Sequence, residues 1–165
     1  RRRMPTPSRP NQPIDPNCWP SPPPFTSMPS AHSSGPVLKV LIFDDELHAK
    51  APQYRVPCID LQIYENADDA TQHVHRERPH VVLMDYSMQG DKNGADALAA
   101  LHALRAHHAL PLRLIAISGS TESNRQMLAV GADDAVPKTH VRAYLSRLAE
   151  RAGHTPHLSS PKGRL

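Results

Sequence analysis

Three short, almost continuously apolar runs constrain the fold of this chain more than any other feature of its sequence. They are VLKVLIF (residues 37–43), VVLM (81–84) and LIAI (114–117). Each run is rich in β-branched residues and too short for a free-standing helix. Continuous apolarity over so short a length is typical of strands that are covered on both faces. A parallel sheet with helices on both sides is therefore predicted.

Two weaker patterns extend this sheet. The run IDLQIY (residues 59–64) alternates between apolar and polar positions, which is typical of a less buried strand. The short run AVP (135–137) is a candidate fifth strand. Because Pro137 has no N–H to donate to a neighbouring strand, this fifth strand is expected at an edge of the sheet.

Helical patterns lie between the strands. They cover residues 67–77 with Asn66 as the N-cap, 94–107, 122–130 with Ser120 or Thr121 as the N-cap and Gly131 after the end, and 140–151 with Thr139 as the N-cap. Before them, Pro52 and Pro57 interrupt the segment after the first strand, so an irregular first helix that ends near Ala51 is expected. Strand and helix alternate five times, which predicts a doubly wound α/β domain over residues 37–152.

The ends of the chain differ from this domain in composition. Eleven of the 18 prolines lie in residues 1–36, a stretch without helical or strand periodicity. We expect a disordered, Pro-rich leader there and a flexible tail at residues 153–165. The net charge of +3 comes from the leader, because basic and acidic side chains balance over residues 37–165. The domain is therefore not expected to bind nucleic acid directly.

Cysteine usage and hydropathy indicate the compartment. Cys18 and Cys58 form no CxxC pattern, which favours a reducing environment without a disulfide framework or a zinc site. No apolar run approaches the roughly 18 residues that a membrane span needs. A soluble, cytoplasmic protein without a membrane partner is predicted.

Polar residues follow the apolar runs at corresponding places. Asp44 and Asp45 follow the first strand, Asp85 the third, Ser118 the fourth and Lys138 the fifth. The carboxyl ends of parallel strands meet at one edge of a sheet, so these side chains are expected to converge. An oxygen-only set of carboxylates suits Mg²⁺, and a carboxylate beside that metal can accept a phosphoryl group. We therefore predict that Asp85 accepts phosphate, with the Ser118 hydroxyl and the Lys138 ammonium binding it.

The segments FDDE, LMDYSMQG, IAISGS and GADDAVPK together resemble the receiver (response regulator) domain of two-component signal transduction. The resemblance implies the flavodoxin-like strand order 2-1-3-4-5. It also implies that Asp44, Asp45 and Asp85 hold Mg²⁺ together with the backbone carbonyl of Ser87, and that Asp85 is the phosphoacceptor. Ser118 and Lys138 are then the phosphoryl-binding and switch residues.

The same resemblance implies a signalling switch rather than an enzyme. A histidine kinase or phosphotransfer protein would donate the phosphoryl group, and a downstream protein or a second copy of the chain would respond. An alternative is a protein-interaction module that works without phosphorylation, because Ala135 replaces the aromatic residue that the family uses as a switch. An aspartate-based phosphatase is disfavoured, since such enzymes place their first acids as DxD, whereas Asp44 and Asp45 are adjacent.

Two other groups of residues are predicted to have no role in the site. Glu46 is expected in the first turn of the first helix, outside the acidic pair. The histidine pairs His73/His75 and His107/His108 point to different faces of their helices, which is poor geometry for a metal. We expect these histidines on a solvated surface.

Overall fold

The computed structural model describes residues 37–91 and 93–153. Its elements are β1 (Leu38–Phe43), α1 (Asp45–Ala49), η1 (Ala51–Tyr54), β2 (Ile59–Tyr64), α2 (Ala70–Glu77), β3 (Val81–Asp85), α3 (Gly94–His108), β4 (Arg113–Ser118), α4 (Thr121–Ala129), β5 (Asp134–Pro137), η2 (Lys138–His140) and α5 (Val141–Gly153), where η marks a 3₁₀ turn. The predicted leader, and the predicted tail beyond Gly153, lie outside the described residues. Within the described residues no helix has the length and apolar character needed to cross a bilayer.

The five strands form one parallel sheet in the order β2-β1-β3-β4-β5. This confirms the predicted fold class and strand order. β5 pairs only with β4, and its last residue, Pro137, lies opposite Ser118 at the end of the ladder. A residue without an N–H is tolerated at this position because β5 forms an edge of the sheet.

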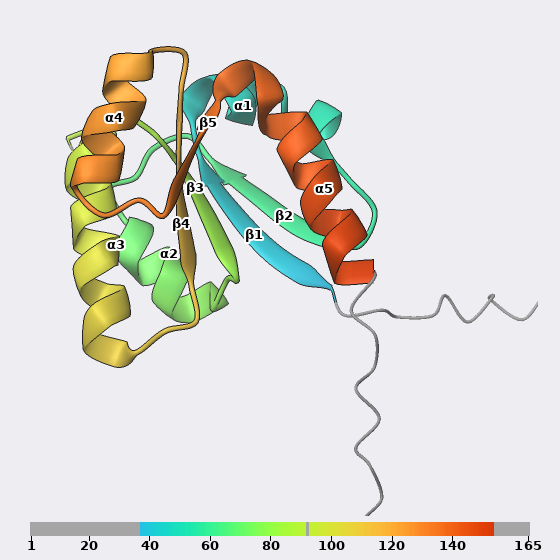
Figure 1. The fold of residues 1–165 in the computed structure, drawn as a ribbon, viewed down its shortest axis with the longest axis horizontal. Coiled ribbons are helices and arrows are strands. Elements are labelled where there is room, and N and C mark those ends of the chain that lie inside the picture. Colours follow the sequence, from blue (N-terminus) through green and yellow to red (C-terminus); the bar gives the residue numbers. More distant parts are fainter. Residues whose placement is uncertain (1–36, 92, 154–165) are drawn as a thin grey trace, which may run out of the picture. The chain divides into compact units, whose positions relative to one another are not determined.

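Side chains of successive strand residues point to opposite faces and build two hydrophobic cores. In β1, Leu41 and Phe43 belong to the core under α2, α3 and α4. Val40 and Ile42, between them, belong to the core under α1 and α5. Figure 1 shows the two layers, with α2, α3 and α4 on one side of the sheet and α1 and α5 on the other. The strands β1, β3 and β4 are therefore covered on both faces, as their continuous apolarity predicts.

The first helix is short and broken, as expected. α1 has five residues, and after Lys50 the chain continues as the 3₁₀ turn η1 with Pro52 in its first turn. Proline is tolerated there because the first N–H groups of a helical turn have no partner within it.

Two predicted helix starts are wrong. Asn66 does not cap α2: its side-chain oxygen accepts a local bond from the N–H of Asp68, and the helix begins at Ala70. Thr139 does not cap α5 either, because the chain already turns at Lys138 and the Thr139 hydroxyl contacts the His140 ring instead. In both cases a short polar side chain contacts a neighbouring residue instead of the free N–H groups at the start of the helix. Ser120, in contrast, caps α4 through the N–H of Ser123.

Candidate functional site

The first component of the site is the acidic pair after β1. Asp44 is fully buried, and its Oδ1 accepts a hydrogen bond of 2.8 Å from the N–H of Leu47, which makes it the N-cap of α1. Asp45 is the first residue of α1 and is half-buried. The end of a buried strand and the start of a helix thus hold two carboxylates at the carboxyl edge of the sheet.

The third carboxylate comes from the neighbouring strand. Asp85 is the last residue of β3, which pairs with β1, and it is only 1% exposed. Carboxylate oxygens of Asp44, Asp45 and Asp85 all lie within 4.8 Å of one another. The structure therefore brings together the three acids that the sequence placed at strand ends.

Lys138 extends into this cluster from the far edge of the sheet. Its Nζ lies 2.8 Å from Oδ2 of Asp85 and 3.2 Å from Oδ2 of Asp44. The same ammonium lies 3.6 Å from Oε2 of Glu46. Sequence reasoning missed this last contact, because Glu46 was assigned only to the first turn of the helix. Glu46 does lie in that turn, but its long side chain also reaches the lysine.

The charges in the cluster perturb one another. Burial raises the pKa of the Asp85 carboxyl above its ordinary value, and the nearby Asp44 raises it further, while the Lys138 ammonium opposes both effects. For Lys138, partial burial lowers the pKa, but the hydrogen bond to Asp85 and the charge of Asp44 outweigh it, so that the pKa rises above its ordinary value. The ammonium is firmly protonated, and the acids around it outnumber it.

A divalent cation fits this arrangement. The buried oxygens Oδ2 of Asp44 and both Oδ atoms of Asp85 have no hydrogen-bond partner among the described residues, apart from the ion pairs of the two Oδ2 atoms with Lys138. Buried carboxylate oxygens without partners are costly unless a cation compensates them. The donor set consists of oxygen alone, which suits Mg²⁺ rather than zinc.

Ser118 and Ser87 lie at the same edge but outside this contact network. Ser118 ends β4 and is 6% exposed, and its Oγ accepts a hydrogen bond of 3.1 Å from the N–H of Ser120. Ser87 is exposed in the loop after β3, two residues beyond Asp85. Ser118 lies at the end of its strand as predicted, whereas the roles of both residues stay predictions.

Gly94 packs directly against the backbone of Asp85, a contact that sequence reasoning missed. It is the first residue of α3, and a Cβ added there would lie 1.7 Å from the backbone carbonyl oxygen of Asp85. Its N–H also donates to the carbonyl of Tyr86. Only a residue without a side chain permits the start of α3 to pack this closely against the end of β3. The sequence signal was the glycine directly after Asn93, whose side chain caps the helix.

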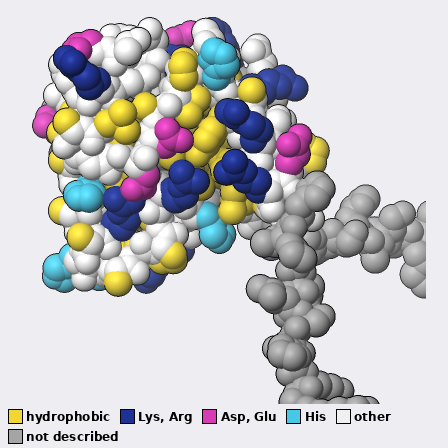
Figure 2. All heavy atoms as spheres, viewed as in Figure 1, with side chains coloured by type: hydrophobic (Ala, Val, Ile, Leu, Met, Phe, Trp, Pro, Cys, Tyr) yellow, Lys and Arg dark blue, Asp and Glu magenta, His cyan; other side chains and the backbone are white. Residues whose placement is uncertain are grey.

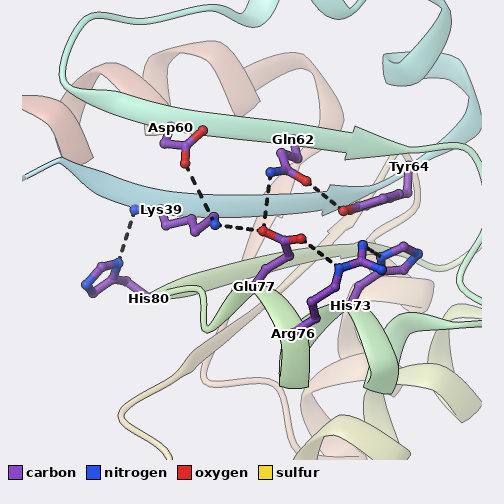
Figure 3. A network of polar contacts seen from close by, with 8 residues as sticks. All are labelled: Lys39, Asp60, Gln62, Tyr64, His73, Arg76, Glu77 and His80. Atoms are coloured by element: carbon purple, nitrogen blue, oxygen red, sulfur yellow. Dashed lines mark hydrogen bonds and ion pairs between the residues drawn. The ribbon is translucent and has the colours of Figure 1, made fainter.

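A second polar network is built on β1, β2 and α2 from other residues (Figure 3). Glu77 accepts from Lys39 Nζ at 2.7 Å and from Arg76 Nε at 2.9 Å. Arg76 also contacts the ring of His73, which lies tilted against the ring of Tyr64 with 3.9 Å between ring centroids. His73 is thus half-buried, and its prediction as a solvated residue is wrong, while the other three histidines of the predicted pairs are exposed.

Comparisons with known proteins agree with this architecture. A family model described as the response regulator receiver domain matches residues 40–150. Among solved structures, the chain is similar to a CheY-like response regulator receiver domain protein from Methanospirillum hungatei JF-1, with 23% identity over 70% of this chain and 94% of that chain and a TM-score of 0.56. It is also similar to the response regulator domain of CheB from Thermotoga maritima, with 23% identity over 70% and 93% of the two chains and a TM-score of 0.51. No curated protein matches the chain in sequence.

Proposed function

The chain belongs to the response regulator receiver domain family, and from this premise we propose that it is a phosphoacceptor switch that takes a phosphoryl group onto Asp85. The observation that supports this proposal best is the ion pair between Lys138 Nζ and Asp85 Oδ2, inside a cluster that holds two further carboxylates. This lysine pairs with a nearly buried aspartate that belongs to a group of carboxylates able to hold a metal. Such an arrangement is more typical of a functional site than of an ordinary surface lysine.

The chemistry follows from the positions of the side chains. An Oδ atom of Asp85 attacks the phosphorus of the donor, and the bond between phosphorus and the donor atom breaks, with its electron pair leaving on the donor. Asp44 and Asp45, with Asp85 and the carbonyl of Ser87, would hold Mg²⁺, which neutralises charge on the phosphoryl oxygens. Lys138 stays protonated and pairs with the new anionic oxygens, and the Ser118 hydroxyl donates a hydrogen bond to one of them.

The rest of the proposal concerns the protein as a whole. Residues 37–152 form the receiver domain, flanked by a Pro-rich leader and a short tail. A histidine kinase or phosphotransfer protein supplies the phosphoryl group, a downstream protein or a second copy of the chain reads the result, and the chain itself is not an enzyme. We place it in the cytoplasm, a reducing compartment that is consistent with the free, exposed Cys58.

Acetyl phosphate with Mg²⁺ tests the phosphoacceptor assignment. Intact-mass spectrometry should show the addition of one phosphoryl group, stable in acid and labile in base as expected of an acyl phosphate. Asp85→Asn should abolish the adduct, and Asp91→Asn, an exposed aspartate of the same loop, should keep it. An adduct that persists in Asp85→Asn would move the acceptor to another residue.

A second candidate is an interaction module that does not need phosphorylation. It is favoured by Ala135, a small half-buried side chain at the position of the family's switch aromatic, and by the five-residue α1. If saturating acetyl phosphate gives no adduct on the wild-type chain, this candidate replaces the first.

A further inference from the structure

Three exposed histidines come together where the helices α2 and α3 end. These helices pack side by side on one face of the sheet (Figure 1). Each runs towards the edge where the next strand, β3 or β4, begins, so their C-terminal ends lie at the same edge. His75 lies in the last turn of α2, and His107 and His108 lie in the last turn of α3. Figure 2 shows histidine side chains on the surface at the lower left, where α3 ends.

The rings of these histidines lie close to one another. The ring centroids of His75 and His108 are 6.4 Å apart, and those of His107 and His108 are 4.6 Å apart. The sequence predicted poor metal geometry because it compared only histidines of the same helix, which point to different faces. The packing of α2 against α3 creates a pairing between helices, His75 with His108, that the pattern of a single helix does not reveal.

The ring separations suit imidazoles that share a zinc ion. An imidazole nitrogen binds Zn²⁺ at about 2.0–2.1 Å, so two rings on one tetrahedral ion have centroids about 5 Å apart. The separations of 4.6 and 6.4 Å lie on either side of this value. The carboxylates of Asp44, Asp45 and Asp85 already have ligand atoms within 4.8 Å of one another, whereas the histidine nitrogens have to converge by rotation of their side chains. All three histidines are exposed, so the core does not restrict that rotation.

The ends of the two helices favour a cation between them. The last carbonyl groups of a helix carry the negative end of its dipole, and two such ends meet at this position. The arginines in the same turns are engaged in other contacts. Arg76 pairs with Glu77, and Arg105 pairs with Asp133. Their positive charges are therefore compensated by carboxylates.

We propose that His75, His107 and His108 bind a zinc ion that joins the C-terminal ends of α2 and α3, with water in the remaining coordination position. Zinc prefers imidazole nitrogen, whereas Mg²⁺ prefers oxygen. This site and the carboxylate cluster therefore select different ions. The inference does not depend on the phosphoryl chemistry proposed for Asp85, because the histidines lie at the edge where the strands begin and Asp85 lies where β3 ends.

Isothermal titration calorimetry of the full-length chain with ZnCl₂ tests the proposal. MgCl₂ is kept in excess, so that it competes with zinc for the carboxylate cluster. The wild type should bind one zinc ion at its tightest site. His75→Ala and His108→Ala should each lower that affinity at least tenfold, and His107→Ala at least threefold. The matched control is His140→Ala, which removes an exposed histidine of η2 and should bind zinc like the wild type.

Thermal unfolding separates metal binding from folding. The three histidines are exposed, so each variant should melt at the wild-type temperature without zinc. Zinc should raise the melting temperature of the wild type and of His140→Ala, but not that of His75→Ala or His108→Ala, because only the intact site binds the folded chain tightly. Unchanged zinc affinity in both His75→Ala and His108→Ala would overturn the proposal. So would an equal loss of affinity in His140→Ala, or zinc binding that excess Mg²⁺ abolishes, which would place the metal on the carboxylates.

Discussion

The two acid–lysine networks of this domain use the same chemical groups and differ in how their charges balance. Around Glu77, two carboxylates, Glu77 and Asp60, meet two cations, Lys39 and Arg76, and each oxygen of Glu77 accepts a hydrogen bond. Around Lys138, one ammonium faces the carboxylates of Asp44, Asp85 and Glu46, and the buried Oδ2 atoms of the two aspartates share this single cation.

This difference separates a structural network from a site prepared for a ligand. A network in which every charged group has a partner contributes its full stabilisation when the protein folds, and it does not require a ligand. A cluster with more buried acids than cations leaves part of its electrostatic cost in the folded state, and a cation or phosphoryl group can relieve that cost later. The two networks should consequently respond in opposite directions when an acid is neutralised.

The largest effect is expected from Lys138→Met. Removing the ammonium leaves Asp44 and Asp85 facing each other without compensation, and breaking a buried ion pair in this way is expected to lower the free energy of unfolding by about 2–4 kcal/mol at pH 7. Urea unfolding without Mg²⁺ measures it. Lys50→Met, which removes an exposed lysine paired with Glu46, is the control and should change stability little.

The double variant Lys138→Met/Asp85→Asn distinguishes charge from packing. Neutralising Asp85 should restore most of the stability that Lys138→Met loses, because the repulsion between the two carboxylates is then absent. If the double variant is as unstable as Lys138→Met alone, the lysine stabilises the domain through its aliphatic chain and the comparison between the networks fails.

The next largest change in stability is expected when Mg²⁺ is added. A ligand that binds only the folded state at ten times its dissociation constant stabilises that state by about 1.4 kcal/mol. Thermal unfolding of the wild-type chain with and without MgCl₂, at matched ionic strength in NaCl, measures the effect. Asp45→Ala should remove most of this gain. An equal gain in NaCl alone would mean general screening rather than a metal site.

Asp85→Asn should have a smaller effect, and it should stabilise the domain, whereas the loss of a buried charge usually destabilises one. Without Mg²⁺ it removes the repulsion from Asp44 and the cost of burying a carboxylate, so we expect a gain of about 1 kcal/mol in the free energy of unfolding. Urea midpoints at pH 7 check this, with Asp91→Asn as the neutral control. A loss of stability would show that Asp85 is a structural partner of Lys138.

The smallest effect is expected from Glu77→Gln, and it should be a loss of a few degrees in melting temperature. The bonds to Lys39 and Arg76 lower the pKa of Glu77 from 4.5 to about 2. A lowered pKa in the folded state means that this contribution is present above about pH 4.5 and is lost as the pH falls towards 2.

The pH dependence of that difference is the sharper measurement. The stability gap between wild type and Glu77→Gln should be constant from pH 7 to about pH 5 and close at lower pH, as judged from urea midpoints while both proteins remain folded. Glu65→Gln, an exposed neighbour on the loop after β2, should show no such gap. A gap that stays open at low pH would mean that glutamine disturbs packing rather than charge.

The sheet and the meeting of Asp44, Asp45, Asp85 and Lys138 could be predicted from the sequence because both follow from topology. Once the apolar runs are taken as parallel strands, the residues that follow them must share one edge. This prediction needs only the order and length of the elements, not the conformation of any side chain.

The side-chain contacts that the sequence did not predict depend on which of several nearby groups each side chain contacts. Asn66 and Thr139 have the right chemistry for N-caps, but each finds a local contact instead, and a sequence pattern does not tell which partner is preferred. Glu46 reaches Lys138 through a flexible side chain from a position next to the acidic pair. The burial of His73 depends on Tyr64, which is brought close only when β2 and α2 pack together.

The close packing at Gly94 links the end of β3 mechanically to α3. Because no side chain lies between the Asp85 carbonyl and the helix backbone, a displacement of that strand end would push directly on the start of α3. A helix of 15 residues is about 22 Å long, so a small tilt at its start becomes a larger swing at its far end near His108. A residue with a side chain at position 94 would therefore have to push the start of α3 away from the end of β3, beside Asp85.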